Sequence, residues 1–165
     1  MSSLLRIPIL LLLGADVERV LWNTLKLAVK RKKAKSLASL KRRAWKLLSE
    51  VVRRQWASVD GYVVCYTCGN AANWKEMQAG HAIPGRTGAV LLDEDIIRPQ
   101  DEKCNIWGRG MHHIFAGKLI RENGVDWWDR KLSESRSVVK WTRSDLEAKI
   151  EKYRARLQAL DSPAR

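Results

Sequence analysis

The spacing of two cysteines is the feature that most restricts how this chain can fold. Cys65 and Cys68 are separated by two residues and followed by Gly69, within the stretch GYVVCYTCG. A tight turn closed by glycine directs two thiolates at one point, as in a zinc knuckle. A redox-active dithiol has the same spacing, but no βαβ pattern surrounds this stretch. We therefore predict a structural zinc site that fixes the fold around this turn.

A tetrahedral zinc site needs two more ligands. Cys104 is the third cysteine, and the chain has no fourth. Asp101 lies three residues before Cys104, so the two repeat the spacing of the first pair, and a carboxylate can bind zinc. His112 or His113 could take the place of Asp101, and in a competing interpretation Cys104 is a free thiol and no zinc binds. The predicted zinc ligands are Cys65, Cys68, Asp101 and Cys104.

The pattern of the remaining sequence predicts an α+β fold. Residues 63–124 alternate short β-branched runs with turns that contain glycine and proline, and then continue into a helix that ends near Gly124. Apolar residues at helical spacing predict helices at 15–31, at 36–56 and after Thr142, where a capping-box-like motif begins the last helix. The expected architecture is a small core with a zinc knuckle, flanked by long N-terminal and C-terminal helices.

These patterns divide the chain into four segments. The apolar run near the N-terminus, LLRIPILLLLGADVE, is too short to span a membrane and has no small-residue cleavage site. We therefore expect it to form a core or oligomer contact, and we expect no membrane partner. The segments are 1–35 (apolar segment, helix and basic link), 36–62 (basic amphipathic helix), 63–124 (zinc-stabilised core) and 125–165 (helical extension).

The charge of the chain favours a polyanionic partner. It has 31 Lys and Arg against 18 Asp and Glu, a formal net charge of +13 and a pI near 10.1. Nucleic acid is the simplest such partner, and a merely basic or ribosome-like protein is the alternative. The basic amphipathic helix could lie on a membrane surface or along a phosphate backbone, and the motifs that follow favour the backbone. Its predicted DNA contacts are Arg42, Arg43 and Lys46.

One histidine has an unusual sequence environment. His81 lies in QAGHAIPGR (78–86), between glycine, proline and arginine. A core histidine needs partners for both ring nitrogens, and the local sequence offers none, so we expect the His81 ring to face an open groove. A neutral imidazole can take a proton from water near pH 7. Arg86 and Arg109 adjoin glycines and are predicted phosphate contacts, with a solvated surface charge as the alternative.

Several short motifs follow one another along the chain. They are Cys65-x-x-Cys68-Gly69, MQAGH, LDE (92–94), RPQ, Cys104-Asn105 and GRG. Their order and spacing resemble the NinG (Rap) family of phage recombination proteins, which look like HNH-type ββα-metal endonucleases. The resemblance covers about residues 36–160, with no counterpart for 1–35. It implies a ββα-metal core and a DNA endonuclease that acts on branched recombination intermediates such as junctions, D-loops and flaps.

The resemblance also implies roles for individual residues. His81 would be the general base, the cysteine positions would hold the structural zinc, and Asn105 would face a catalytic Mg²⁺ or Mn²⁺ from the start of the helix. His112 or His113 could be the second ligand of this catalytic metal. The expected partner is DNA, branched in form, and the expected location is the cytoplasm of a phage-infected bacterium. The sequence leaves a homodimer open.

Four residues depart from the HNH pattern. Gly80 stands where other HNH enzymes have a metal-binding aspartate, and Ile96 stands at the middle asparagine. Arg98 replaces a histidine of many family members, and Asp101 replaces a cysteine. Two further hypotheses follow: a catalytically silent DNA-binding zinc module, and a helix-rich scaffold for recombination proteins. DNA cleavage in Mg²⁺ or Mn²⁺ separates the endonuclease from both, and bound zinc separates the module from the scaffold.

Overall fold

The computed structural model of the protein describes residue 19, residues 35–85 and residues 88–162. The chain divides after Lys35 into two units, of which the second is described by itself below. The predicted helix at 15–31 and the basic link that follows it lie outside the described residues, except for the single position 19. Arg86, a predicted phosphate contact, also lies outside them.

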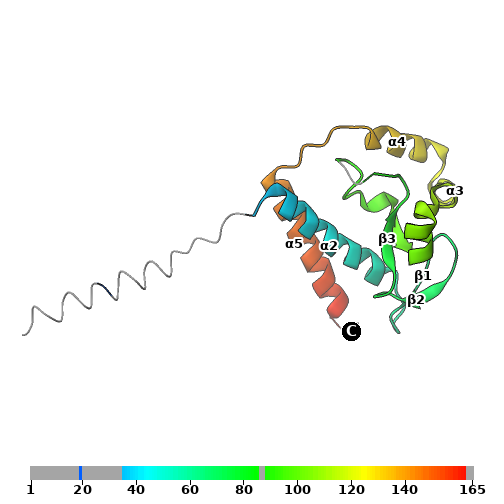
Figure 1. Ribbon diagram of the computed structural model, residues 1–165, viewed down its shortest axis with the longest axis horizontal. Coiled ribbons are helices and arrows are strands. Elements are labelled where there is room, and N and C mark those ends of the chain that lie inside the picture. Colours follow the sequence, from blue (N-terminus) through cyan, green and yellow to red (C-terminus); the bar gives the residue numbers. More distant parts are fainter. Residues whose placement is uncertain (1–18, 20–34, 86–87, 163–165) are drawn as a thin grey trace, which may run out of the picture. The chain divides into compact units, whose positions relative to one another are not determined.

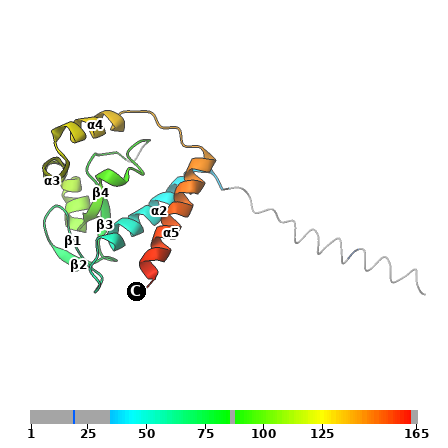
Figure 2. The ribbon, with the colours of Figure 1, turned by 180° about the vertical axis from the view of Figure 1, so that it is seen from behind.

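Two helices of 19 residues each lie side by side in the second unit (Figures 1 and 2). They are α2 (Leu37–Gln55) and α5 (Arg143–Asp161), and both begin where the sequence predicted. The Ser36 hydroxyl caps α2 by accepting a hydrogen bond from a first-turn N–H. Thr142 and Asp145 form a capping box at the start of α5, which satisfies two otherwise unpaired N–H groups.

The apolar faces of α2 and α5 form a large part of the main core. Arg54 of α2 forms an ion pair with Asp161, so the C-terminal ends of the two helices meet. Leu37 and Leu160 continue the apolar stripes in the sequence, but they are 45% and 40% exposed, because they lie in the first turn of α2 and the last turn of α5. The buried stripe residues are Leu40, Ala44, Leu48, Val51 and Val52 in α2 and Leu146, Ile150, Tyr153 and Leu157 in α5.

Two short antiparallel hairpins lie between these helices in the sequence. β1 (Tyr62–Val64) pairs with β2 (Ala71–Asn73), and β3 (Gln78–His81) pairs with β4 (Ile97–Gln100). The first hairpin encloses the turn that contains the Cys-x-x-Cys motif. In the second, His81 lies opposite Ile97 at the end of the ladder. The strands are only three or four residues long, so the hairpins rely on packing against helices for stability.

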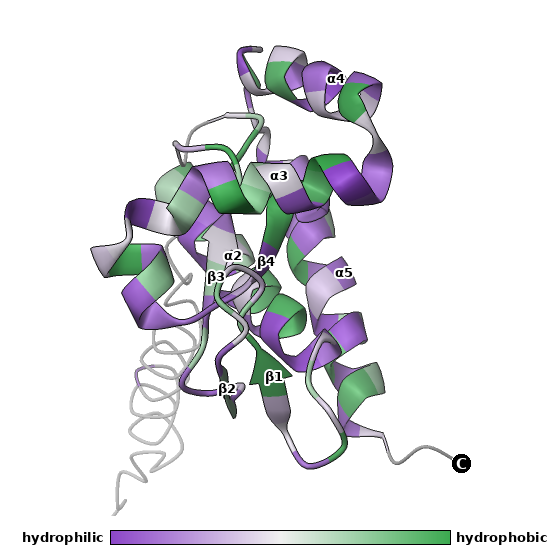
Figure 3. Cartoon of the chain, turned by 90° about the vertical axis from the view of Figure 1, so that its right-hand side faces the viewer, coloured by the Kyte–Doolittle hydropathy of each residue, from purple (hydrophilic) through white to green (hydrophobic). Residues whose placement is uncertain are grey.

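The chain after β4 forms two short helical turns and then regular helices. They are the π-helix η2 (Lys103–Trp107), the 3₁₀ turn η3 (Arg109–Met111), α3 (His112–Asn123) and α4 (Val125–Ser135). The sequence predicted a helix ending near Gly124, and α3 ends one residue earlier. It placed α4 only within a general helical extension. Figure 3 shows apolar and hydrophilic segments alternating along α3, α4 and α5.

The fold is therefore a mixture of helices and two small sheets, as the sequence predicted. α2, β3, β4, α3 and α5 contribute to the main core, and a smaller apolar cluster surrounds two of the cysteines. Within residue 19, residues 35–85 and residues 88–162, no helix combines the length and apolar character needed to cross a membrane.

Candidate functional site

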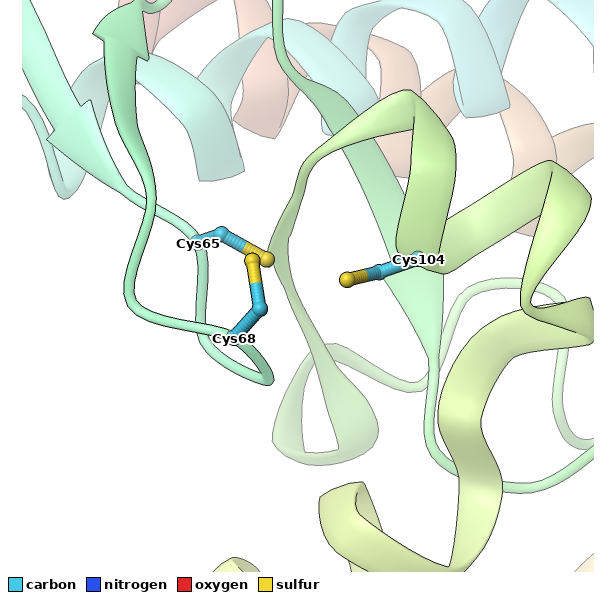
Figure 4. Close-up of side chains that lie close together, drawn as sticks. All are labelled: Cys65, Cys68 and Cys104. Atoms are coloured by element: carbon cyan, nitrogen blue, oxygen red, sulfur yellow. The ribbon is translucent and has the colours of Figure 1, made fainter.

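The three cysteines meet beside the first hairpin (Figure 4). Cys65 and Cys68 lie in the turn between β1 and β2, and Cys104 faces them from η2. Their Sγ atoms all lie within 4.8 Å of one another, and all three are free thiols. Thiolates bound to one zinc ion lie about 3.8 Å apart, since each Zn–S bond is about 2.3 Å long. Small side-chain rotations would therefore bring the three Sγ atoms to the spacing that zinc requires. The cluster could therefore hold a metal such as zinc.

Local hydrogen bonds prepare this cluster for a metal. The main-chain N–H of Gly69 donates to the Cys65 carbonyl at 3.0 Å, and Gly69 has a φ of +82° that suits glycine, so the turn closes tightly. Burial alone raises the pKa of the Cys65 thiol. The sulfur also receives hydrogen bonds from the main-chain N–H groups of Asp101 and Cys68 and from the Thr67 side chain. These hydrogen bonds outweigh the effect of burial and lower the pKa to about 7. Cys65 is thus partly thiolate at neutral pH, the form that binds metal.

Cys104 has the opposite electrostatic character. Burial, together with the neighbouring Cys68 and Cys65 thiols, raises the pKa of its thiol to about 11. A metal that binds near neutral pH therefore displaces a proton from Cys104, since a metal-bound thiol is deprotonated.

The Asp101 carboxylate does not belong to the cluster in this structure, and its role as the fourth ligand stays a prediction. Its two carboxylate oxygens accept hydrogen bonds from the Asn70 side-chain amide at 2.6 Å and from the Lys103 N–H at 2.7 Å, and neither belongs to the ligand cluster. Its main-chain N–H instead donates to the Cys65 Sγ at 3.2 Å. Asp101 therefore supports the cluster through hydrogen bonds: its main chain contacts Cys65, and its side chain links Asn70, next to the first cysteine pair, with Lys103, next to Cys104. His112 and His113, the alternative ligands, do not belong to the cluster either.

A pocket of about 180 Å³ brings together four of the predicted site residues. His81 reaches it from the end of β3, Asn105 from η2, and His112 from the start of α3. Arg109 approaches it from η3, and Pro84, Gly85 and Gly110 complete its wall. His113 does not line the pocket and is exposed, so the structure separates the two adjacent histidines that the sequence left as alternatives.

His81 is more enclosed than the sequence suggested. Its side chain is only 7% exposed, and its ring stacks on the Trp45 indole of α2, with ring centroids 4.7 Å apart. Its Nε2 lies 3.3 Å from the Leu91 carbonyl oxygen. The sequence next to His81 offered no such contacts, because Trp45 and Leu91 are distant from it in the chain. A carbonyl oxygen only accepts, so Nε2 carries the proton in this contact and Nδ1 carries the lone pair.

Two other polar side chains of the pocket, those of Asn105 and His112, are also oriented by hydrogen bonds. The Asn105 Nδ2 donates to the Gln78 Oε1 at 2.6 Å, which leaves the Asn105 Oδ1 as an oxygen ligand for a hard cation. The His112 Nδ1 donates to the Ala82 carbonyl at 3.0 Å, which leaves the lone pair on Nε2. Asn105 was expected at the start of the helix, but it lies in η2, before α3 begins at His112.

A buried glutamine occupies the space above Gly80. A Cβ at position 80 would lie 1.7 Å from the Gln100 Oε1, which no real Cβ tolerates. Gln100 is fully buried, and its Nε2 donates to the Thr67 hydroxyl at 3.2 Å and to the Gly110 carbonyl at 2.9 Å. These bonds hold the Gln100 amide in place. The sequence did not single out Gln100, although its position within the RPQ motif was a signal.

The predicted DNA contacts on α2 are accessible. Arg42, Arg43 and Lys46 are all exposed, and Trp45, which stacks on His81, lies between them in the sequence. The basic residues of α2 are therefore neighbours of Trp45, the residue that stacks on His81 of the pocket. Arg53 and Arg54, near the end of the same helix, are half-buried, and Arg54 is held by Glu50 and Asp161.

The structure is that of a small α+β protein in which a thiol cluster that could hold a metal lies beside a β-hairpin, together with a pocket lined by histidine and asparagine. The chain belongs to the family of the bacteriophage lambda NinG protein, whose family model matches residues 18–162. The predicted family is thereby confirmed, and the match includes residues before position 36 that the motifs did not cover. No curated protein and no solved structure matches the chain.

Proposed function

We propose that the protein is a metal-dependent endonuclease that cleaves branched recombination-intermediate DNA. The pocket carries this proposal, because it gathers His81, Asn105, Arg109 and His112 from four separate elements. The order of elements supports it: β3 and β4 form a hairpin that is followed by α3, which is the order of a ββα-metal unit.

The residues of the pocket fit the parts that phosphodiester hydrolysis requires. The Nδ1 of His81 is the atom that takes the proton of an attacking water, because Nε2 is committed to the Leu91 carbonyl. The Asn105 Oδ1 and the His112 Nε2 are the atoms that would hold a Mg²⁺ or Mn²⁺ ion, and Arg109, which lines the same pocket, would pair with a phosphate oxygen. A bound divalent ion would polarise the phosphate and stabilise the leaving oxygen.

One observation favours the second candidate, a DNA-binding zinc module without catalysis. His81 is buried and stacked, whereas a general base must reach the water that it activates. Geometry in an unliganded site often tightens when substrate binds, so this burial does not remove His81 as a candidate. Cleavage assays separate the two functions.

The test of the endonuclease is cleavage of four-way junction, fork, flap and duplex DNA by the purified protein, with Mg²⁺, with Mn²⁺ and with neither. We expect metal-dependent cleavage that favours the branched substrates. Asn105→Ala should require about tenfold or more Mn²⁺ for half-maximal cleavage, because it removes an oxygen ligand, and Asn105→Asp, which keeps an oxygen, should require less. Cleavage by Asn105→Ala at the metal concentration that the wild type needs would show that Asn105 is not a metal ligand. DNA binding by the wild-type protein without any cleavage would favour the silent module.

The basic face of α2 should carry much of the salt dependence of DNA binding. Each phosphate contact contributes about 0.9 to the slope of log affinity against log salt, so replacing Arg42, Arg43 and Lys46 by Gln should reduce the slope by up to about 2.7. The measurement is a fluorescence anisotropy titration at several salt concentrations. A triple variant of equal charge change, made at the exposed residues Arg130, Arg136 and Lys140, is the matched control. An equal reduction in both variants would show a general charge effect and no DNA path along α2.

A further inference from the structure

We propose that Trp107, with Ile106 beside it, is a stacking wedge that contacts an unpaired or splayed base at the branch point of the DNA. This inference rests on the proposed DNA function and names the feature of the substrate that the protein recognises. It requires only DNA binding and is independent of catalysis.

The first observation is the exposure of two large apolar side chains on one short helix. Trp107 is 78% exposed and Ile106 is 51% exposed, both on η2. Burying a tryptophan is strongly favourable, so an indole that is left in water beside a functional pocket marks a contact surface. Neither side chain contributes to the main core or to the smaller apolar cluster.

The second observation is the position of Trp107 along the chain. Asn105 lies two residues before it and Arg109 two residues after it, and both of these line the pocket. Two residues span at most about 7 Å between Cα atoms, whereas successive bases of a strand are about 3.4 Å apart. The Trp107 backbone therefore lies within about two base steps of two residues that line the pocket.

The third observation is that η2 is anchored near its start and closed by a tight turn at its end. Cys104, one residue into the helix, is buried in the thiol cluster, and the Gly108 N–H donates to the Lys103 carbonyl at 2.6 Å. A Cβ at Gly108 would meet the Met111 Sδ at 2.8 Å, so the chain turns sharply there. A rigid support reduces the entropy that an aromatic side chain loses on binding.

The backbone beyond this turn is held in an uncommon conformation. Arg109, Gly110 and Met111 have φ values of +50°, +83° and +47°, a region that non-glycine residues rarely adopt. Such strain persists where the surrounding structure imposes it, and here the Gln100 amide holds the Gly110 carbonyl. The turn therefore fixes the direction of Arg109 relative to Trp107.

Charge decides which partner fits this surface. Lys103 and Arg109 are exposed on either side of the two apolar residues, and the whole chain carries a net charge of +13. An indole flanked by cations matches a base that is flanked by phosphates, and any base can stack because every base has a π face. Bases in a continuous duplex are already stacked, whereas bases at a branch can be splayed. The wedge therefore favours branched over duplex DNA.

The test compares the affinities of the full chain for a four-way junction and for a duplex of equal length, in buffer without Mg²⁺ or Mn²⁺. Trp107→Ala should weaken junction binding about 5- to 100-fold and change duplex binding less than about twofold, as expected for one lost base stack. Trp107→Phe should keep most of the preference for the junction. Val138→Ala, at an 85% exposed apolar residue outside η2, is the matched control and should bind both DNAs as the wild type does.

Three results would contradict the proposal that Trp107 is a stacking wedge. The first is unchanged junction binding by Trp107→Ala, and the second is an equal loss of affinity for both DNAs. The third is an altered oligomeric state in sedimentation with DNA binding intact, which would make Trp107 a protein contact. The result is independent of catalysis. If the wild-type protein binds junctions without cutting them in Mn²⁺, the proposed endonuclease activity is contradicted. The comparison of Trp107 variants still tests the wedge in that case, because it measures binding alone. A wild-type protein that binds neither DNA contradicts both.

Discussion

His81→Ala is expected to lower the rate of metal-dependent cleavage of branched DNA by about two to four orders of magnitude, the range of a positioned general base. The affinity for junction DNA and the zinc content should stay at the wild-type level, because His81 lies outside the thiol cluster and on the strand end rather than on the basic face of α2. Single-turnover cleavage rates at saturating protein measure the effect.

Two further variants make this result specific. His81→Gln keeps a polar side chain of similar length against Trp45, so it should retain more stability than His81→Ala while losing the same activity. His113→Ala changes the exposed histidine outside the pocket and should cleave at the wild-type rate. If His81→Ala cuts at the wild-type rate, His81 is not the base, and the silent binding module becomes the better hypothesis.

Cys65→Ser should remove the zinc and lower the melting temperature by about 8–16 °C. A metal present at about 1,000 times its Kd stabilises the folded state by about 4 kcal/mol, and each kcal/mol corresponds to about 2–4 °C for a chain of this size. Serine is a poor zinc ligand, and it also loses the thiolate that the Asp101 and Cys68 N–H groups stabilise. Metal analysis and thermal unfolding, with and without added zinc, measure both effects.

Asp101→Asn is the matched control for the zinc site. It keeps one oxygen acceptor for the Asn70 or Lys103 donors but abolishes the carboxylate. Because this carboxylate lies outside the cluster, the variant should still bind one zinc per chain. Loss of zinc from Asp101→Asn would show that the aspartate joins the site when the metal binds. A wild-type protein that binds no zinc would contradict the site altogether.

The sequence predicted those features that depend on residues close together in the chain. The start of α2 near Ser36, the capping box at Thr142, the tight turn at Gly69 and most of the apolar stripes of α2 and α5 act over a few residues, and these are confirmed. The meeting of Cys104 with the first cysteine pair could also be predicted, because thiols at metal-ligand spacing have a chemical reason to converge.

Contacts between distant segments could not be predicted in the same way. The partners of His81 come from α2 and from the loop before β4, and no pattern around position 81 indicates them. The choice between His112 and His113 depends on the left-handed backbone at Met111, which sets the direction in which α3 begins. The orientation of the Asp101 carboxylate depends on its donor Asn70, which lies 31 residues away.

The contact between Gln100 and Gly80 makes two positions mutually dependent. An aspartate at position 80 alone would collide with the buried carboxamide across the ladder, and a shorter residue at 100 alone would open a void and release the Gly110 carbonyl. Each single substitution is therefore unfavourable, while the pair could be accommodated together. A change at both positions would thus have to pass through a less stable intermediate, so Gly80 and Gln100 act as one unit in the packing of this hairpin.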